Sequence, residues 1–592
     1  MTGWVADNRD QKGDFKMEFI QKKTADNAVE SFLPKAADKG TKLAWDRFEG
    51  QLPECGFCET GLSCRDCLQG PCISHPFRDA NKLGVCGKDK DIMAVQTLLK
   101  LVIKGTMASL DQVSDFVEGV ASGAVKPKDA AEAEKIIAEI EALLKGGGAG
   151  LQKAFPKALL AVWEEAGIYP QGVAKDLFKA SQKVEGGVAC VEETLFWAFK
   201  AALLGAFAQK LQGGLKKAVF GAAPAEIEVN MGVLKKDAAN ILLYGRFSPV
   251  LKAKIAAAAA KKNVAVSGVC TDPLLASYVF APVTSYGSQE LPLMTGAVDL
   301  IVVGDQFVNP SLAAIAAEYQ VAVVATETLK AQSPDAFAKA IVEKAVNAFE
   351  FRRSIVRDIP VAKETALMGL STADLNVKKI AEALNGGKIK GIAILAGTNN
   401  VKYTQDLPFV SMAKEFLKGD VLCISEGDAS VSLAKYGFLN PRQCEKHCAP
   451  GVAGLLKTAG SNLPAVLDFG YAENGGVAEF LLALSVAAKK AVKELPVLAC
   501  FAEANRNAEV AEALSLVAMG VSTYFWPSLP VTGSPKTMQA LAMLCGEKFG
   551  AKLIVHTDKK MEPLAKARMI LKVFNRVEDP SLKDHPWTDW KK

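Results

Sequence analysis

Six of the 13 cysteines in this 592-residue chain fall within one short segment, from Cys55 to Cys86. The last four follow the spacing C-x2-C-x4-C-x13-C, which puts three thiols on a tight loop and a fourth further along the chain. Thiolates suit iron–sulfur clusters, and a cubane takes four of them. The spacing favours a [4Fe–4S] cluster, while structural zinc and metal-free thiols stay open as alternatives. The four expected ligands are Cys64, Cys67, Cys72 and Cys86.

Cys55 and Cys58 form a separate C-x2-C pair ahead of this set. Disulfides are rare in the cytoplasm, and an odd number of cysteines fits complete pairing poorly, so a metal is the better interpretation. Two ligands cannot complete a site that takes four. A pair left over beside a full set therefore suggests a metal shared between two chains.

Composition narrows the class of protein. At roughly 100–200 residues per domain the length predicts three or four domains, and a hydrophobic share of 50% allows large buried cores. A net charge of +5 is too small to argue for nucleic acid or an acidic membrane surface. Residues 1–25 lack an apolar signal core, and no later apolar run reaches the roughly 18 residues that cross a bilayer. We therefore expect a cytoplasmic protein with no nucleic-acid or membrane partner.

The remaining sequence divides into a helical part and a part that alternates strands with helices. Apolar spacing of three and four predicts helices over 94–105, 129–146 and 192–211. After about residue 236, short β-branched runs alternate with helical segments, which predicts parallel, doubly wound sheets. We expect a helical domain at 1–235 and Rossmann-like domains at 236–380 and 381–592, with a charged helical stretch near 340–385. The predicted strands are 239–245, 264–269, 298–305, 321–327, 390–397, 421–425, 464–470, 495–501 and 552–557.

The segment from Trp45 to Gly87, WDRFEGQLPECGFCETGLSCRDCLQGPCISHPF…GVCG, resembles the N-terminal signature of the anaerobic nickel–iron carbon monoxide dehydrogenases. Further matches lie at 229–245, 288–306, 394–400 and 530–535, in the same order along the chain. The resemblance implies a homodimer with a helical N-terminal domain and two Rossmann-like domains. It assigns the four-cysteine set to a [4Fe–4S] relay called the B-cluster. It also implies a ferredoxin-like electron carrier, or a redox partner enzyme.

The resemblance assigns Cys55 and Cys58 to half of a D-cluster that bridges the two subunits. Their C-x2-C form resembles the branch with a [2Fe–2S] bridging cluster, and a [4Fe–4S] cluster is the alternative.

The family's catalytic C-cluster, a nickel–iron–sulfur centre, is held by one histidine and five cysteines. Only one of the six matching positions in this chain keeps its ligand. Threonine and tyrosine hydroxyls are poor nickel ligands, phenylalanine is none, and arginine is cationic. We therefore predict that nickel is absent and that carbon monoxide is not oxidised. The six positions hold Arg246, Cys270, Phe307, Thr398, Asp428 and Tyr471.

Two further features of the family's active site are also missing. Its catalytic lysine falls on Ala508, and its proton-shuttling histidines fall on Ser109, Gln112 and Asp115. Imidazole titrates near neutrality whereas hydroxyls do not, so the proton path is lost as well. Loss of ligands, base and proton path together is the pattern expected from loss of one reaction.

A different metal centre could occupy the old cavity. Cys444, His447 and Cys448 place two thiols and an imidazole within five residues, and Cys500 could point into the cavity together with Cys270. Glu426 and Asp428 would add hard oxygen ligands, which favour an iron–oxo centre over a nickel thiolate one. The alternative is that these thiols only pack against their neighbours.

The leading hypothesis is an iron–sulfur oxidoreductase or electron-transfer protein that keeps its relay clusters without oxidising carbon monoxide. One rival is an oxidoreductase with a remodelled cluster, reducing a small nitrogen species such as hydroxylamine. Two further rivals are a retained carbon monoxide dehydrogenase and a non-catalytic partner of such an enzyme.

Overall fold

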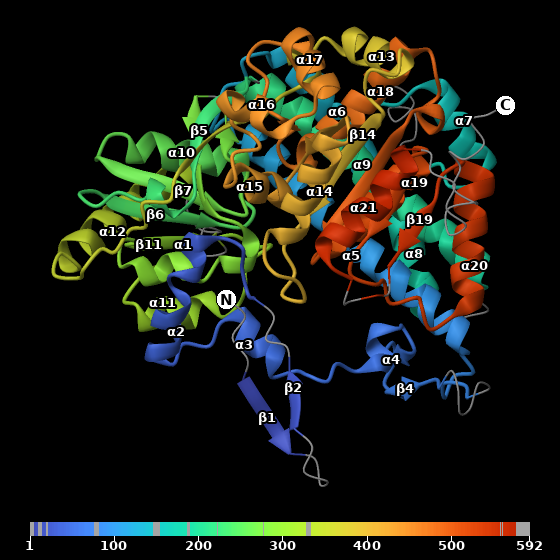
Figure 1. Cartoon of the computed structure of the whole chain (residues 1–592), viewed down its shortest axis with the longest axis horizontal. Helices are drawn as coiled ribbons and strands as arrows, with labels where there is room; N and C mark the ends of the chain where they lie inside the picture. The colour runs from blue at the N-terminus through green and yellow to red at the C-terminus, as the bar shows by residue number, and fades with distance from the viewer. Residues whose placement is uncertain are drawn as a thin grey trace.

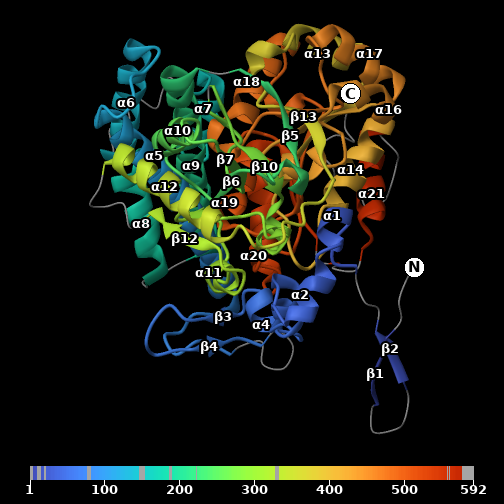
Figure 2. The same cartoon turned by 90° about the vertical axis from the view of Figure 1, so that its left-hand side faces the viewer.

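The computed structural model combines two parallel β-sheets with a layer of long helices. In Figure 1 the first sheet, in green, lies to the left of the second, in orange and red, and Figure 2 shows the helices α5 to α9 from the side. This arrangement confirms the predicted α/β class. The structure describes residues 5–9, 15–18, 22–75, 82–145, 154–185, 190–221, 223–275, 277–326, 333–556, 558 and 561–575.

The N-terminal segment forms short elements along the lower edge of the molecule, where both views show it in blue (Figures 1 and 2). Its helices are one or two turns long and its strands are short, so the segment is held by its contacts rather than by its own secondary structure. They are β1 (Val5–Arg9), β2 (Phe15–Glu18), α1 (Asn27–Glu30), α2 (Leu33–Lys39), α3 (Ala44–Glu49), α4 (Gly56–Glu59), β3 (Ser63–Cys64) and β4 (Cys72–Ile73).

The helical layer is built on α5 (Lys90–Ala121) and α9 (Val191–Phe220), which pack along each other. Two glycines permit close approach: a Cβ at Gly105 would lie 2.3 Å from the carbonyl oxygen of Asn507, and one at Gly213 would lie 2.0 Å from that of Asn474. Both contacts bring the helices onto helical segments that follow strands of the second sheet. The other helices of this layer are α6 (Ala130–Lys145), α7 (Lys157–Glu165) and α8 (Val173–Glu185).

By length and composition, α5 is the one helix in the described part of the chain that could cross a membrane. In its most apolar stretch 56% of the residues are buried inside the protein. It packs against α9 and α19 (Asn507–Ala518), so it is a core helix of this fold.

The first sheet has the strand order β10-β7-β6-β11-β12, and all its pairs are parallel. Every residue of β6 is buried, as expected for a central strand with helices on both faces. Its strands are β6 (Ala239–Tyr244), β7 (Val264–Val269), β10 (Ala281–Thr284), β11 (Leu300–Val303) and β12 (Ala322–Ala325), and its helices are α10 (Pro249–Ala259), α11 (Leu312–Glu318) and α12 (Pro334–Phe351).

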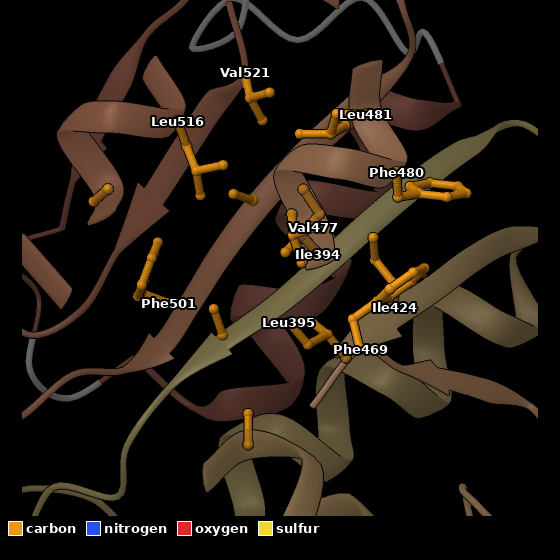
Figure 3. Packing of buried hydrophobic residues seen from close by; sticks show 14 of the residues in the cluster. Ile394, Leu395, Ile424, Phe469, Val477, Phe480, Leu481, Phe501, Leu516 and Val521 are labelled. Atoms are coloured by element: carbon orange, nitrogen blue, oxygen red, sulfur yellow. The ribbon is translucent and has the colours of Figure 1, made fainter. Parts of the chain in front are cut away.

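The second sheet has the order β16-β15-β14-β17-β18-β19, again entirely parallel. Figure 3 shows Ile394 and Leu395 of its central strand packed among apolar side chains from the adjoining strands and helices. The strands are β14 (Gly391–Gly397), β15 (Val421–Ser425), β16 (Val466–Asp468), β17 (Val497–Glu503), β18 (Ser522–Phe525) and β19 (Leu553–Val555). The helices include α13 (Val377–Asn385), α14 (Leu407–Lys418), α15 (Asp428–Ala434), α16 (Cys444–His447), α17 (Pro450–Ala459), α18 (Gly476–Ala488), α20 (Pro535–Leu544) and α21 (Pro563–Phe574).

All nine predicted strands are present, with shorter bounds in most cases, but the sequence did not predict one strand in each large sheet. These strands, β10 and β18, are only four residues long and carry little pattern. The stretch near 340–385 was wrongly expected to be helical throughout, because β13 (Glu364–Met368) lies within it and pairs antiparallel with β5 (Ala225–Val229). Such a ladder depends on a partner distant in sequence, so local pattern cannot reveal it. The exact domain boundaries stay a prediction.

Candidate functional site

The cysteine segment crosses the lower edge of the molecule around α4, β3 and β4 (Figures 1 and 2). β3 and β4 pair antiparallel, which sets Cys64 directly opposite Cys72. Cys64 is buried, Cys72 is half-buried, and Cys67 and Cys86 are exposed. The four thiols line one cavity of about 150 Å³.

Backbone groups enclose this cavity closely. The backbone N–H of Val85 donates to the Sγ of Cys72 over 3.4 Å. A Cβ at Gly70 would lie 3.3 Å from the Cys72 nitrogen and 3.4 Å from the Cys64 carbonyl oxygen. Hydrogen bonds to cysteine sulfur are one of the means by which proteins tune iron–sulfur clusters. The donor set and the enclosure therefore fit a four-thiolate cluster.

Asp66 forms an ion-pair network beside the cavity. Its carboxylate accepts from Lys88 over 3.1 Å and from Lys100 over 2.6 Å, and only 7% of its side chain is exposed. It also shares a hydrogen bond with the thiol of Cys64, whose pKa is raised mainly by burial. Two ammonium groups thus lie near the place where thiolate charge would collect.

Cys55 caps the N-terminus of α4 and Cys58 lies within this one-turn helix, and both are exposed. The hydroxyl of Ser63 donates to the Sγ of Cys58 over 3.4 Å. Hydrogen bonds from the backbone and side chain of Cys58 lower the pKa of Cys55. Both thiols are therefore accessible to a group outside the chain.

The second region lies where strands of the two sheets end and face each other. We call it the strand-end cluster, and its members follow six different strands. Parallel strands place such residues along one edge of each sheet, which is where ligands of doubly wound folds collect. Its members are Arg246 after β6, Cys270 after β7, Phe307 after β11, Thr398 after β14, Asp428 after β15 and Tyr471 after β16.

Arg246 is held by a charge partner and two aromatic rings. Its guanidinium forms an ion pair with Glu473, and its Cζ lies 4.6 Å from the ring centre of Phe307 and 5.4 Å from that of Tyr471. Burial lowers its pKa to about 9, so the group stays cationic at neutral pH. The position thus holds a paired cation.

Arg506 joins this group, although no sequence pattern predicted a role for it. Its Cζ lies 4.1 Å from the ring centre of Phe307, and its Nε donates to Glu509 over 3.1 Å. Phe307 therefore contacts two guanidinium groups. The only hint in the sequence was proximity, because Arg506 lies two residues before Ala508, the position that matches the family's lysine.

Asp428 links the two sheets through hydrogen bonds. Its carboxylate accepts the backbone N–H of Tyr286 over 3.0 Å and the thiol of Cys270 over 3.8 Å. Burial raises the pKa of Asp428 to about 6 and that of Cys270 well above its ordinary value. Cys270 is therefore a neutral thiol that donates a hydrogen bond.

Two non-glycine members have strained backbone. Cys270 has φ 55° and Phe307 has φ 65°, both in the left-handed region that favours glycine. Such conformations persist where the surroundings over-determine them, and they gather at functional sites. Phe307 has this strained backbone although its side chain carries no atom that could bind a metal.

Thr398 and Tyr471 complete the cluster without hydrogen bonds from their hydroxyl groups. Among the described residues, neither the Oγ1 of Thr398 nor the phenol oxygen of Tyr471 has a partner, and both side chains are buried. The backbone N–H of Thr398 donates to the carbonyl oxygen of Glu503 over 3.1 Å. Burial raises the pKa of the Glu503 carboxyl group well above its ordinary value.

Two cavities open beside the cluster. One, of about 620 Å³, is lined by Gln112 and Asp115 of α5 together with Arg246. The other, of about 290 Å³, is lined by Ala508, Phe307 and Arg506 among others. Gln112 and Asp115, at the positions of the family's shuttle histidines, thus line a cavity beside the cluster. Their side chains are an amide and a carboxylate instead of imidazoles.

The four candidate replacement ligands lie in two places. Cys500 is fully buried in the middle of β17. Cys444 begins α16 and Cys448 follows it, with their Sγ atoms 4.0 Å apart. The ring centre of His447 lies 4.3 Å from that of Phe438. Within the described residues, no three His, Cys, Asp or Glu side chains come close enough together to hold a single metal ion.

Comparison with known proteins identifies the fold and the family. The family model described as "Prismane/CO dehydrogenase family" matches residues 62–132 and 127–560, which is most of the chain. The chain belongs to the Prismane/CO dehydrogenase family. This membership makes it an iron–sulfur oxidoreductase by descent, and the resemblance stated from its sequence motifs is confirmed.

Relatives of this family match along nearly their whole length. The chain is 28% identical to carbon monoxide dehydrogenase 2 of Carboxydothermus hydrogenoformans, over 90% of this chain and 95% of the relative. The structure of carbon monoxide dehydrogenase IV from the same organism superposes with a TM-score of 0.86 at 28% identity, covering 93% of this chain and 98% of that one. A nickel-free carbon monoxide dehydrogenase from Thermococcus sp. AM4 gives a TM-score of 0.84 at 29% identity, covering 93% and 96%.

The strand-end cluster does not fit the nickel–iron–sulfur centre that the sequence resemblance implies for this family. Such a centre needs soft donors, and Cys270 is the one thiol among the six positions. That thiol already donates to Asp428, while Arg246 and Phe307 pack against each other. The hydroxyl groups of Thr398 and Tyr471 have no hydrogen-bond partner among the described residues, but hydroxyl groups are poor nickel ligands.

Proposed function

We propose that this protein is an iron–sulfur electron carrier of the Prismane/CO dehydrogenase family, without nickel and without carbon monoxide oxidation. The observation that carries the proposal is the pair of guanidinium groups stacked on Phe307 at the strand ends. A buried cation repels a metal ion, and removing its counter-charge is costly. A nickel centre would have to displace Arg246 from Glu473 and Phe307.

The cysteine segment supports the electron-transfer half of the proposal. Cys64, Cys67, Cys72 and Cys86 would hold one [4Fe–4S] cluster in the cavity that they line. A cluster of this kind accepts and releases single electrons. The backbone N–H of Val85 and the ammonium groups of Lys88 and Lys100 would offset the negative charge that reduction adds.

We further propose that two copies of the chain bind a bridging cluster between them. Cys55 and Cys58 are exposed, and a two-fold axis would bring identical pairs together, so two ligands per chain suffice. Exposed apolar side chains of the same segment, Leu52, Leu68 and Leu83, support a contact there. The bridging cluster is a [2Fe–2S] or a [4Fe–4S] cluster.

The wider setting of the protein is also a proposal. We infer a cytoplasmic homodimer that exchanges electrons with a ferredoxin-like carrier or a redox partner enzyme, under anaerobic conditions. Neither nucleic acid nor a membrane is expected as a partner, since the net charge is only +5.

Iron counting on anaerobically purified protein tests the proposal. Relay clusters alone give about five irons per chain, one cubane plus half a [2Fe–2S] cluster, and a catalytic centre would add about three or four more. About five irons, no nickel and a reduced-state EPR signal of a cubane are expected. Iron well above this value without nickel would instead favour a remodelled cluster, in which Cys270 and Cys500 or the group around His447 serve as ligands.

A further inference from the structure

Cys444 and Cys448 form a close thiol pair on a short helical turn, away from the cysteine segment. Their Sγ atoms lie 4.0 Å apart. Residues four apart in a regular helix have Cβ atoms about 5–6 Å apart, which exceeds the roughly 3.5–4.5 Å of a disulfide. Here α16 ends at His447 and Cys448 has extended backbone, with φ −95° and ψ 146°. The helix therefore does not fix the distance between the Cys448 thiol and that of Cys444.

The turn that carries the two thiols is fixed at both ends. The backbone N–H of Cys448 donates to the carbonyl oxygen of Cys444 over 3.2 Å, and that of Ala449 donates to Leu417 of α14 over 3.0 Å. The ring of His447 is held against Phe438. Both cysteines are half-buried, so small reagents can reach them while the pair keeps its spacing.

The two thiols contact each other directly. Their sulfur atoms share one hydrogen bond in which either can be the donor. The thiolate is the nucleophile in thiol–disulfide exchange, so one member of the pair can attack an external disulfide and the other can resolve it. The spacing of the pair therefore carries the inference.

We propose that Cys444 and Cys448 are a redox-active dithiol that a low-molecular-weight disulfide oxidises to an intramolecular disulfide. In the first step the Sγ of one cysteine loses its proton to solvent, attacks the external disulfide, forms a mixed disulfide and releases one thiolate. In the second step the Sγ of the other cysteine loses its proton to solvent and attacks the protein sulfur of the mixed disulfide, which releases the second thiolate. Two protein thiols are thus oxidised while one external disulfide is reduced to two thiols.

The site is independent of the iron clusters proposed above, because none of the cluster cysteines takes part. Cys423 acts electrostatically on Cys448, but its own thiol is fully buried on β15. We expect Cys423 to stay reduced, so the exchange ends with the Cys444–Cys448 bond.

The test treats the full-length protein with oxidised glutathione and analyses tryptic peptides by mass spectrometry. Trypsin cleaves after Lys446, between the two cysteines, so a disulfide would keep the two fragments joined until a reductant is added. The wild-type protein is expected to give this linked pair, with two hydrogens lost. Cys448→Ser is expected to keep one glutathione on Cys444.

Cys444→Ser provides the matched control. It is expected to keep one glutathione on Cys448, because its mixed disulfide has no second thiol to resolve it. Cys190 is exposed and distant in sequence, so it should react equally in all three proteins and report equal folding. A wild-type mixed disulfide that never resolves, or wild-type protein in which neither cysteine is oxidised, would overturn the proposal.

Discussion

The cysteine segment and the strand-end cluster differ in what became of their thiols, although both occupy positions where this family's sequence motifs place metal ligands. The first keeps all six thiols, facing a cavity or solvent. The second has one thiol, which donates to Asp428, and its arginine packs against two aromatic rings, while the hydroxyl groups of Thr398 and Tyr471 have no hydrogen-bond partner among the described residues. The charged and aromatic side chains of the second region therefore stabilise one another, whereas the thiols of the first region have few partners within the described part of the chain.

Electrostatics explains why the charged residues of the strand-end cluster occur together with partners. An isolated buried charge is costly unless it is paired, and each charged member of the cluster has a partner. Arg246 pairs with Glu473 and Arg506 with Glu509, while Asp428 accepts a backbone N–H. In the cysteine segment the thiols line a cavity or are exposed, as expected if an external group binds them.

Removing one cysteine of the relay set should have the largest effect. Cys64→Ala deletes a buried ligand of the proposed cubane, so about four irons per chain and the reduced-state EPR signal should be lost. The measurement is iron analysis with EPR at low potential. Cys190→Ala, which removes an exposed cysteine elsewhere, should change neither quantity. An unchanged signal in Cys64→Ala would refute the assignment.

Breaking the ion pair of the strand-end cluster should cost stability. Arg246→Met leaves Glu473 buried without its cation, and losses of this kind are about 3–5 kcal/mol. The double variant Arg246→Met/Glu473→Gln should recover a large part of that loss. Chemical denaturation of the two variants measures the difference. Equal stability of single variant and wild type would show that the pair does not hold the cluster.

The raised pKa of Asp428 predicts a pH dependence of stability. Because the folded-state pKa is about 6 and the ordinary value is 3.8, the native state binds the extra proton, and stability falls as pH rises through this window. Asp428→Asn should remove this slope, changing the stability difference from wild type by about 1 kcal/mol between pH 5 and pH 8. Urea denaturation at both values tests it, with the exposed Asp335→Asn as control. A pH-independent difference would contradict the buried carboxylate account.

The smallest effect should come from the charges beside the cysteine segment. Lys100→Met removes one of the two ammonium groups on Asp66, so the reduction potential of the proposed cubane should fall, since added electrons lose a nearby positive charge. Asp66→Asn should move the potential the opposite way. EPR-monitored redox titration measures both. Shifts of the same sign in the two variants would contradict the electrostatic origin.

Sequence reasoning predicted the parts of this molecule that depend on local pattern or motif. The β-branched runs of β6 and β14 and the cysteine spacing needed no knowledge of tertiary structure. By contrast, Glu473 and Arg506 carry no signal of their own, because their roles depend on which loops meet across the two sheets. The antiparallel pairing of β5 with β13 was missed for the same reason.

Nickel content is the measurement that decides whether the strand-end cluster has lost its metal centre. The chain should be produced anaerobically with nickel supplied, purified, and analysed for metals together with viologen-linked carbon monoxide oxidation. Because Arg246 packs against Phe307, and Asp428 accepts the hydrogen bond of the one thiol in the strand-end cluster, we expect iron without nickel and no turnover. Stoichiometric nickel accompanied by carbon monoxide oxidation would contradict this interpretation.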